Sequence, residues 1–185
     1  QYRMAAIRPS QVGLADEDVI DFVESIGERT GEFLQVVNLN LRGSQYAIAG
    51  TVAGLEELER EIDRRRAEFG GKRAFILVPG IDVPFHSTVL RGGVDDFRAR
   101  LLDLLPETID PSILVGRYIP NLVPRLFTLD RDFVQEIADL VPSEPLADVL
   151  GQWDDWAARP ADLCRVILTE LLAWQFASPV RWIET

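Results

Sequence analysis

Apolar residues in the first 79 positions recur with two different periods. Short apolar runs with β-branched centres predict strands, and stretches with an apolar residue every three or four positions predict helices. The predicted strands cover residues 4–8, 33–40, 46–49 and 73–78, and the predicted helices begin near Val19 and just after Thr51. The resulting order, βαββαβ, is that of a ferredoxin-like unit, a sheet with two helices on one face. This order alone implies no activity, because the fold carries many functions.

The last of these runs, residues 73–78, is apolar throughout its middle. That pattern predicts a strand that is buried on both faces.

The second half of the chain is rich in helical patterns and poor in strands. Helices are predicted over residues 94–105, 130–140 and 161–175, with shorter helical pieces around Trp153 and Trp156 and one short strand at residues 113–115. Little sheet is left for these helices to cover. We therefore expect the missing sheet to come from chain before Gln1, and this half to expose an apolar patch or to self-associate.

These patterns together predict an α+β chain in two parts. Residues 1–79 form the ferredoxin-like part, and residues 80–185 form the helix-rich part.

Composition narrows the class of partner. The formal net charge is −11 and the sequence pI is about 4.6, which argues against nucleic acid or an anionic membrane, since phosphates need a basic excess. The single cysteine, Cys164, cannot form an internal disulfide and fits the cytoplasm. No apolar run is long enough to span a membrane, and no signal peptide is visible. The missing initiator methionine suggests a piece of a longer chain.

One loop, residues 80–88, contains the only histidine, His86, between a predicted strand and a predicted helix. A lone histidine is more often a packing or surface residue than a catalytic one. However, Pro84 restricts the backbone before it, and Ser87 or Thr88 can cap the helix after it. A loop braced at both ends suits a catalytic side chain. One histidine and one cysteine cannot build a zinc site, so we expect no metal.

Several stretches together resemble the malonyl-CoA:acyl-carrier-protein transacylases. The resemblance is closest to the malonyl/palmitoyl transferase domain of large type I fatty acid synthases of the bacterial and fungal kind. The most specific matches are Asn38-Leu39-Asn40 and Val83-Pro84-Phe85-His86-Ser87-Thr88. The others are residues 4–7, 45–50, 118–122, 143–145 and 178–182, in the family's order. The resemblance implies a ferredoxin-like subdomain inserted into an α/β-hydrolase-like acyltransferase subdomain, to which residues 80–185 would belong.

The resemblance also implies a serine–histidine mechanism in which His86 is the base. The backbone carbonyl of Gln175 would orient its imidazole, although Gln175 can also simply end a helix. Asn38, Asn40 and Asn121 would lie at the substrate cleft; the alternative is that the paired asparagines bond to local backbone at a strand end. Asp82 lies too close to His86 in sequence for a triad, and we expect no role for it.

By the same resemblance, the substrates are coenzyme A thioesters and the phosphopantetheine of an acyl carrier domain, with no cofactor bound by the chain itself. The partners are acyl-CoA, that carrier domain and the rest of the parent synthase. The nucleophilic serine, in a Gly-His-Ser-x-Gly elbow, would precede Gln1, so we expect the 185 residues alone to be inactive. The alternative is a non-enzymatic ferredoxin-like binding or structural module of a multidomain synthase.

Overall fold

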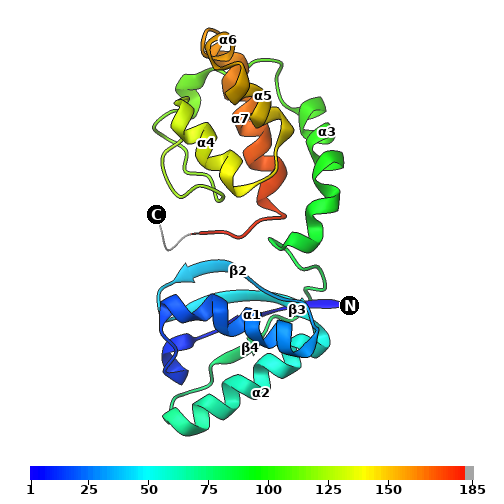
Figure 1. The fold of residues 1–185 in the computed structure, drawn as a ribbon, viewed down its shortest axis with the longest axis vertical. Coiled ribbons are helices and arrows are strands. Elements are labelled where there is room, and N and C mark those ends of the chain that lie inside the picture. Colours follow the sequence, from blue (N-terminus) through cyan, green and yellow to red (C-terminus); the bar gives the residue numbers. More distant parts are fainter. Residues whose placement is uncertain (182–185) are drawn as a thin grey trace. The chain divides into compact units, whose positions relative to one another are not determined.

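The computed structural model describes residues 1–181. These residues form two compact units (Figure 1). The first unit contains residues 1–90 together with the segment that begins at Ser178, and the second contains residues 91–177. The boundary expected between residues 79 and 80 stays a prediction.

The first unit is built on a four-stranded sheet with two helices. Its elements are β1 (Tyr2–Ile7), α1 (Val19–Thr30), β2 (Leu34–Leu41), β3 (Gln45–Thr51), α2 (Val52–Phe69) and β4 (Phe75–Leu77), with short 3-10 turns at Pro9–Val12 and Asp16–Asp18. The strand order across the sheet is β2-β3-β1-β4, and each neighbouring pair is antiparallel. The predicted order of strands and helices is therefore confirmed.

The core of this unit lies between the sheet and its two helices. The buried side chains of α1 and α2 form one apolar cluster with those of β1, β2 and β3. Thr51 caps α2: its hydroxyl accepts a hydrogen bond from the Gly54 N–H at 3.1 Å and donates one to Glu32 at 2.5 Å. The opposite face of the sheet carries a smaller apolar cluster that contains Met4 and Val37.

The prediction that residues 73–78 are buried on both faces is wrong. β4 is a three-residue edge strand that pairs only with β1. Phe75 is buried, but the side chain of Leu77 is 49% exposed. The reason is the antiparallel arrangement: the apolar run was typical of a central parallel strand, whereas an edge strand has one open side.

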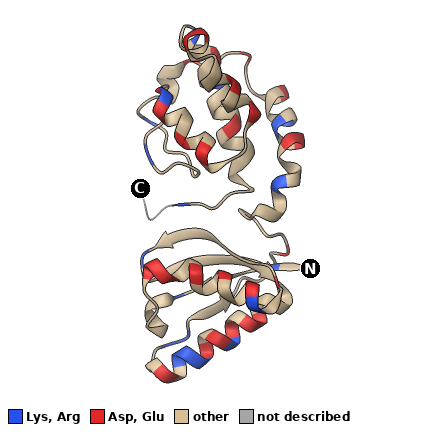
Figure 2. Ribbon diagram, in the orientation of Figure 1, with Lys and Arg blue, Asp and Glu red and all other residues tan. Residues whose placement is uncertain are grey.

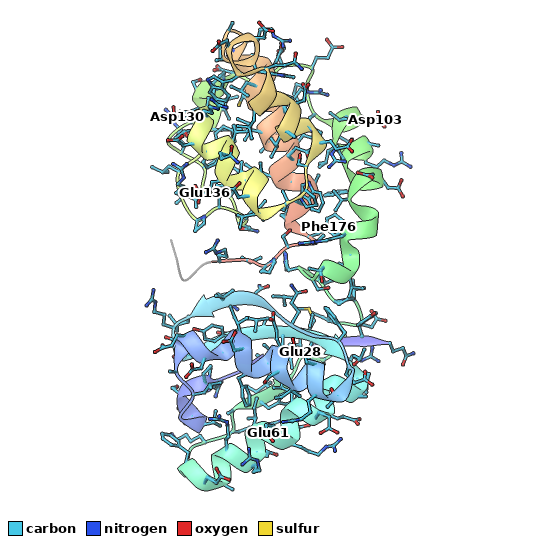
Figure 3. All side chains as sticks on the ribbon, in the orientation of Figure 1. Glu28, Glu61, Asp103, Asp130, Glu136 and Phe176 are labelled. Carbon is cyan, nitrogen blue, oxygen red and sulfur yellow. The ribbon has the colours of Figure 1, made fainter. Side chains whose placement is uncertain are left out.

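The second unit is helical. Its elements are the helices α3 (Val94–Leu104), α4 (Arg131–Leu140), α5 (Glu144–Gly151), α6 (Trp153–Ala157) and α7 (Pro160–Gln175), with a 3-10 turn at Pro111–Ile113; another 3-10 turn, Thr88–Gly93, precedes α3. α7 packs against α3, α5 and α6. Four of its apolar residues face inward and are buried: Leu163, Ile167, Leu171 and Trp174. Phe176, labelled in Figure 3, packs edge-on against Phe97 of α3 with 5.3 Å between ring centroids.

The prediction of a strand at residues 113–115 is wrong. This stretch begins inside the 3-10 turn Pro111–Ile113. The Asp110 side chain accepts a hydrogen bond from the Ser112 N–H at 2.9 Å, and Pro111 occupies the first helical position. An Asp-Pro pair therefore starts a helical turn where β-branched composition alone favoured a strand.

Charge and exposed apolar side chains are spread over the helices. Figure 2 shows acidic residues on helices of both units and mixed charge on α2. In the second unit Leu104 is 81% exposed, and Leu102, Ile113 and Leu126 are exposed as well. The expected self-association stays a prediction.

Within residues 1–181, no helix combines the length and the apolar character needed to cross a bilayer.

Cys164 is fully buried on α7. Burial, with a smaller contribution from the Asp110 carboxylate, raises the pKa of its thiol to about 11 from the usual 9.0. The thiolate is the reactive form, so at pH 8 we expect the native chain to react with a disulfide reagent about a hundredfold more slowly than the denatured chain. Equal rates before and after denaturation would show that Cys164 is accessible.

Candidate functional site

His86 lies in the loop that follows β4, in the first unit, and its side chain is half-buried. Its backbone φ is 62°, and no other non-glycine residue among residues 1–181 has a positive φ. Residues in the left-handed region are strained unless the surroundings hold them there, and such strain is concentrated at functional sites. This backbone conformation is the first structural sign that His86 has a role beyond packing.

Two local hydrogen bonds shape the loop around His86. The Phe85 N–H donates to the Val83 carbonyl at 2.9 Å, and the buried Ser87 hydroxyl donates to the Pro84 carbonyl at 2.6 Å. The Ser87 hydroxyl therefore closes a tight turn across the histidine. The loop is braced on both sides of His86, as Pro84 led us to expect.

A third contact ties this loop to the sheet. Gln35 of β2 accepts hydrogen bonds from the Thr88 N–H at 2.9 Å and from the Thr88 hydroxyl at 3.2 Å. β2 is also the strand that carries Asn38 and Asn40. The structure therefore joins the histidine loop to the strand of the predicted asparagine pair, through a residue that the sequence did not single out.

Asn38 and Asn40 lie in an irregular part of β2. The pairing of β2 with β3 shifts register between Val36 and Asn38 and again between Leu39 and Leu41. The Oδ1 atom of Asn38 is buried and has no hydrogen-bond partner. A buried carbonyl oxygen without a donor is unusual, so this atom is a candidate to accept a hydrogen bond from a ligand.

The segment from Ser178 returns to the outer edge of β2. Val180 pairs with Asn38 as a parallel bridge: the Leu39 N–H donates to the Val180 carbonyl at 2.9 Å, and the Val180 N–H donates to the Val37 carbonyl at 2.8 Å. The buried hydroxyl of Ser178 has no partner. Three of the stretches that carry the resemblance therefore meet at β2; Trp182, at the end of the third, lies outside the described residues.

The remaining predicted site residues belong to the second unit. Gln175 is the last residue of α7, and Asn121 lies in the loop of residues 116–127. Hydrogen bonds from Gly116 N–H to the Phe127 carbonyl (3.0 Å) and from Phe127 N–H to the Tyr118 carbonyl (2.7 Å) close that loop. The structure does not relate Gln175 or Asn121 to His86, so their roles stay predictions.

A buried polar cluster in the second unit went unpredicted. The Glu170 carboxylate, on α7, is 1% exposed and accepts a bidentate pair of hydrogen bonds from Arg98 of α3, at 2.5 Å from Nε and 2.9 Å from Nη2. It also accepts hydrogen bonds from the Ser143 hydroxyl at 2.7 Å and from the Trp174 indole at 3.2 Å. Ser143 in turn caps α5 by accepting from the Leu146 N–H. One carboxylate thus fixes three helices.

The hydrogen bond to Glu170 raises the pKa of Arg98. Burial lowers this pKa, and the contact with Asp95 raises it further.

A cleft of about 520 Å³ opens beside this pair. It is lined by Arg91, Val94, Asp95, Arg98, Pro142, Glu144, Pro145, Asp148 and Trp174. The buried Glu170 carboxylate is therefore hydrogen-bonded to Arg98, Ser143 and Trp174 at once. Among residues 1–181, no group of three histidine, cysteine or acidic side chains is arranged to hold a metal ion.

Similarity to known proteins decides the family. No family model matches the chain. It is 37% identical over 221 residues to Fatty acid synthase 2 of Mycosarcoma maydis, covering 100% of this chain and 6% of that protein. It is 35% identical over 186 residues to the fatty acid synthase beta subunit TOXC of Cochliobolus carbonum, covering 83% of this chain and 9% of that protein. The chain belongs to the fatty acid synthase family. It represents less than a tenth of the length of either relative.

Solved structures show which fold this fatty acid synthase segment has. It superposes on FabD of Acinetobacter baumannii with a TM-score of 0.60 and 21% identity, covering 98% of this chain and 41% of FabD. It superposes on the malonyl CoA-acyl carrier protein transacylase of Coxiella burnetii with a TM-score of 0.62 and 18% identity, covering 100% and 42%. The segment therefore has the α+β fold of part of a malonyl transacylase.

Proposed function

We propose that this chain is part of an acyltransferase that moves malonyl and long-chain acyl groups between coenzyme A and an acyl carrier domain during fatty acid synthesis. One observation carries the proposal. A chain that is 37% identical along its whole length to a segment of a fatty acid synthase has the fold of part of a malonyl transacylase. The strained, braced conformation of His86 supports a catalytic role for the only histidine of the sequence.

In the proposed reaction His86 is a general base and then a general acid. It takes the proton of a serine hydroxyl while the serine oxygen attacks the thioester carbonyl of acyl-CoA. The carbon–sulfur bond then breaks, and His86 returns the proton to the departing thiolate. In the second half, the phosphopantetheine thiol gives its proton to His86 and its sulfur attacks the acyl-serine ester. The bond between the acyl carbon and the serine oxygen then breaks, and His86 returns the proton to that oxygen.

The nucleophilic serine of this proposal lies in a Gly-His-Ser-x-Gly elbow outside residues 1–185. Ser87 is unsuited to the role, since its hydroxyl is buried and donates to the Pro84 carbonyl at 2.6 Å. A hydroxyl held in that way faces the loop backbone rather than a substrate.

The other site residues keep their predicted roles in the proposal. The Gln175 carbonyl orients the imidazole, and Asn38, Asn40 and Asn121 line the cleft. The orphaned Oδ1 of Asn38 supports its assignment, because a substrate N–H or O–H group would satisfy it.

The two-part architecture belongs to the proposal as well. We assign residues 1–79 to a ferredoxin-like subdomain and residues 80–185 to the larger acyltransferase subdomain. The element order and the antiparallel β2-β3-β1-β4 sheet support the first assignment.

An acyl carrier domain is the proposed partner. One structural neighbour is a malonyl-transacylase solved in complex with a type II PKS acyl-carrier protein, with a TM-score of 0.59 and 19% identity to this chain. The substrates, by the same reasoning, are coenzyme A thioesters and a phosphopantetheine thiol. The proposed compartment is the cytoplasm, which the single, unpaired and buried Cys164 supports.

A loading experiment tests the proposal. The 185-residue chain and a parent chain extended upstream through the serine elbow are each incubated with malonyl-CoA and followed by intact-protein mass spectrometry. We expect one malonyl group on the extended chain and none on residues 1–185, because losing the nucleophile costs roughly a millionfold in such enzymes. Malonylation of the short chain at comparable rates would refute the assignment of the nucleophile. An extended chain that stays unloaded would refute the acyltransferase assignment.

A further inference from the structure

One glutamine is bonded to the chain just beyond the histidine. Gln35 lies on β2, half-buried, and its Oε1 accepts both hydrogen bonds that Thr88 donates, from N–H at 2.9 Å and from Oγ1 at 3.2 Å. The two residues are 53 positions apart in the sequence. The contact is therefore a tertiary clamp between the sheet and the loop.

The clamp acts on the segment where the backbone is strained. The Ser87 hydroxyl donates a hydrogen bond to the Pro84 carbonyl and so spans His86. The next residue, Thr88, is fixed to β2 by Gln35. A non-glycine residue stays at a φ of 62° only where neighbouring contacts over-determine it. The Ser87–Pro84 hydrogen bond lies within the loop, whereas the contact through Gln35 attaches the loop to a strand of the sheet.

We propose that Gln35 is a positioning residue for His86: its amide oxygen fixes Thr88, and thereby holds the His86 backbone in the left-handed conformation from which the imidazole serves the reaction. This inference rests on the proposed function of His86. Gln35 does not touch the reacting atoms, and its effect reaches them only through the loop.

The chemistry of the clamp suggests matched variants. Gln35→Met keeps the length of the side chain and removes the acceptor. Gln35→Glu keeps oxygen acceptors and should rescue the clamp. The control is Gln11→Met, because Gln11 in the same unit also accepts a long-range backbone hydrogen bond, from the Lys72 N–H at 3.1 Å.

The first readout needs no catalysis. Amide hydrogen exchange of Thr88 and the backbone coupling constant of His86 are measured by NMR on residues 1–185, where the single histidine gives an unambiguous signal. We expect Gln35→Met to speed exchange at Thr88 by roughly tenfold, the equivalent of one lost hydrogen bond, and to change the His86 coupling constant. Gln35→Glu and Gln11→Met should leave both unchanged. Unchanged values in Gln35→Met would overturn the clamp.

The second readout is acyl loading by the upstream-extended chain. Gln35→Met is expected to lower kcat by about 10- to 100-fold with little change in KM, since misplacing a catalytic group by about 1 Å has that effect. Gln35→Glu should restore the rate. Equal rates for Gln35→Met and Gln11→Met would overturn the positioning role. Should Gln35→Met fail to fold, Thr88→Val removes the hydroxyl half of the clamp, and a wild-type kcat there would count against it.

The two proposals can fail separately. A His86→Ala variant that still loads would refute the function proposed for His86, while Thr88 exchange would still report whether the clamp exists. Loss of loading in His86→Ala together with wild-type kcat in Gln35→Met would refute only the positioning role.

Discussion

His86→Ala is expected to lower the rate of acyl loading by roughly a millionfold in the chain extended upstream through the serine elbow, as loss of the histidine does in other serine–histidine enzymes. Without a base, the serine hydroxyl remains a weak nucleophile, and the departing thiolate has no proton donor. The measurement is the single-turnover rate of malonyl transfer from coenzyme A, with the variant's thermal unfolding compared with that of the wild type.

Asp82→Asn is the matched control. Asp82 is exposed, lies in the same loop and is the carboxylate nearest to the histidine in sequence. We expect its loading rate to stay within about threefold of the wild type, which is the size of change that loss of a surface charge produces. A loss comparable to that of His86→Ala would mean that a carboxylate, and not the Gln175 carbonyl, orients the imidazole.

Arg98→Met is expected to destabilise the second unit by about 3–5 kcal/mol. The change leaves the Glu170 carboxylate, 1% exposed, without its bidentate partner, and an unpaired buried charge is costly. Because Glu170 also holds Ser143 and Trp174, the loss should extend to the packing of α5 and α7. Urea unfolding followed by tryptophan fluorescence measures the effect, since all four tryptophans of the sequence follow residue 150.

Two further variants separate the effect of burying an ion pair from the effect of losing one of its charges. Arg64→Met removes the exposed ion pairs that Arg64 forms with Glu68 and with Glu61, which is labelled in Figure 3, and we expect little change in stability. The double variant Arg98→Met with Glu170→Leu removes both charges together and should be less destabilised than Arg98→Met alone. A single Arg98→Met variant as stable as Arg64→Met would show that the pair is not buried in solution.

Much of the fold could be predicted from hydrophobic periodicity. The apolar faces of α1 and α7 and the cap at Thr51 follow from local rules that a single sequence displays. The two errors have different causes, one in the neighbours of a strand and one in the residues before it. Residues 73–78 had the composition of a central strand but lie at a sheet edge, and at residues 113–115 the preceding Asp-Pro pair overrode β-branched composition.

The sequence could nominate candidate site residues where a residue type is chemically distinctive. His86 is the only histidine, and the asparagine pair falls within a matched stretch. Gln35 and Glu170 were missed because their hydrogen-bond partners are distant in the sequence. Gln35 is one polar residue on a strand, and its partner lies 53 positions away. Glu170 interrupts an otherwise apolar stripe on α7, and a charged residue there is a signal that sequence analysis could have used, since a buried charge needs a partner.

The most direct test of the account is chemical rescue of His86→Ala by free imidazole in the upstream-extended chain. If His86 carries the proton between serine and thiol, then the variant should be inactive alone and should regain malonyl loading as imidazole is added, with a rate that depends on the neutral form of imidazole. A His86→Ala chain that loads malonyl at the wild-type rate without imidazole would contradict the account.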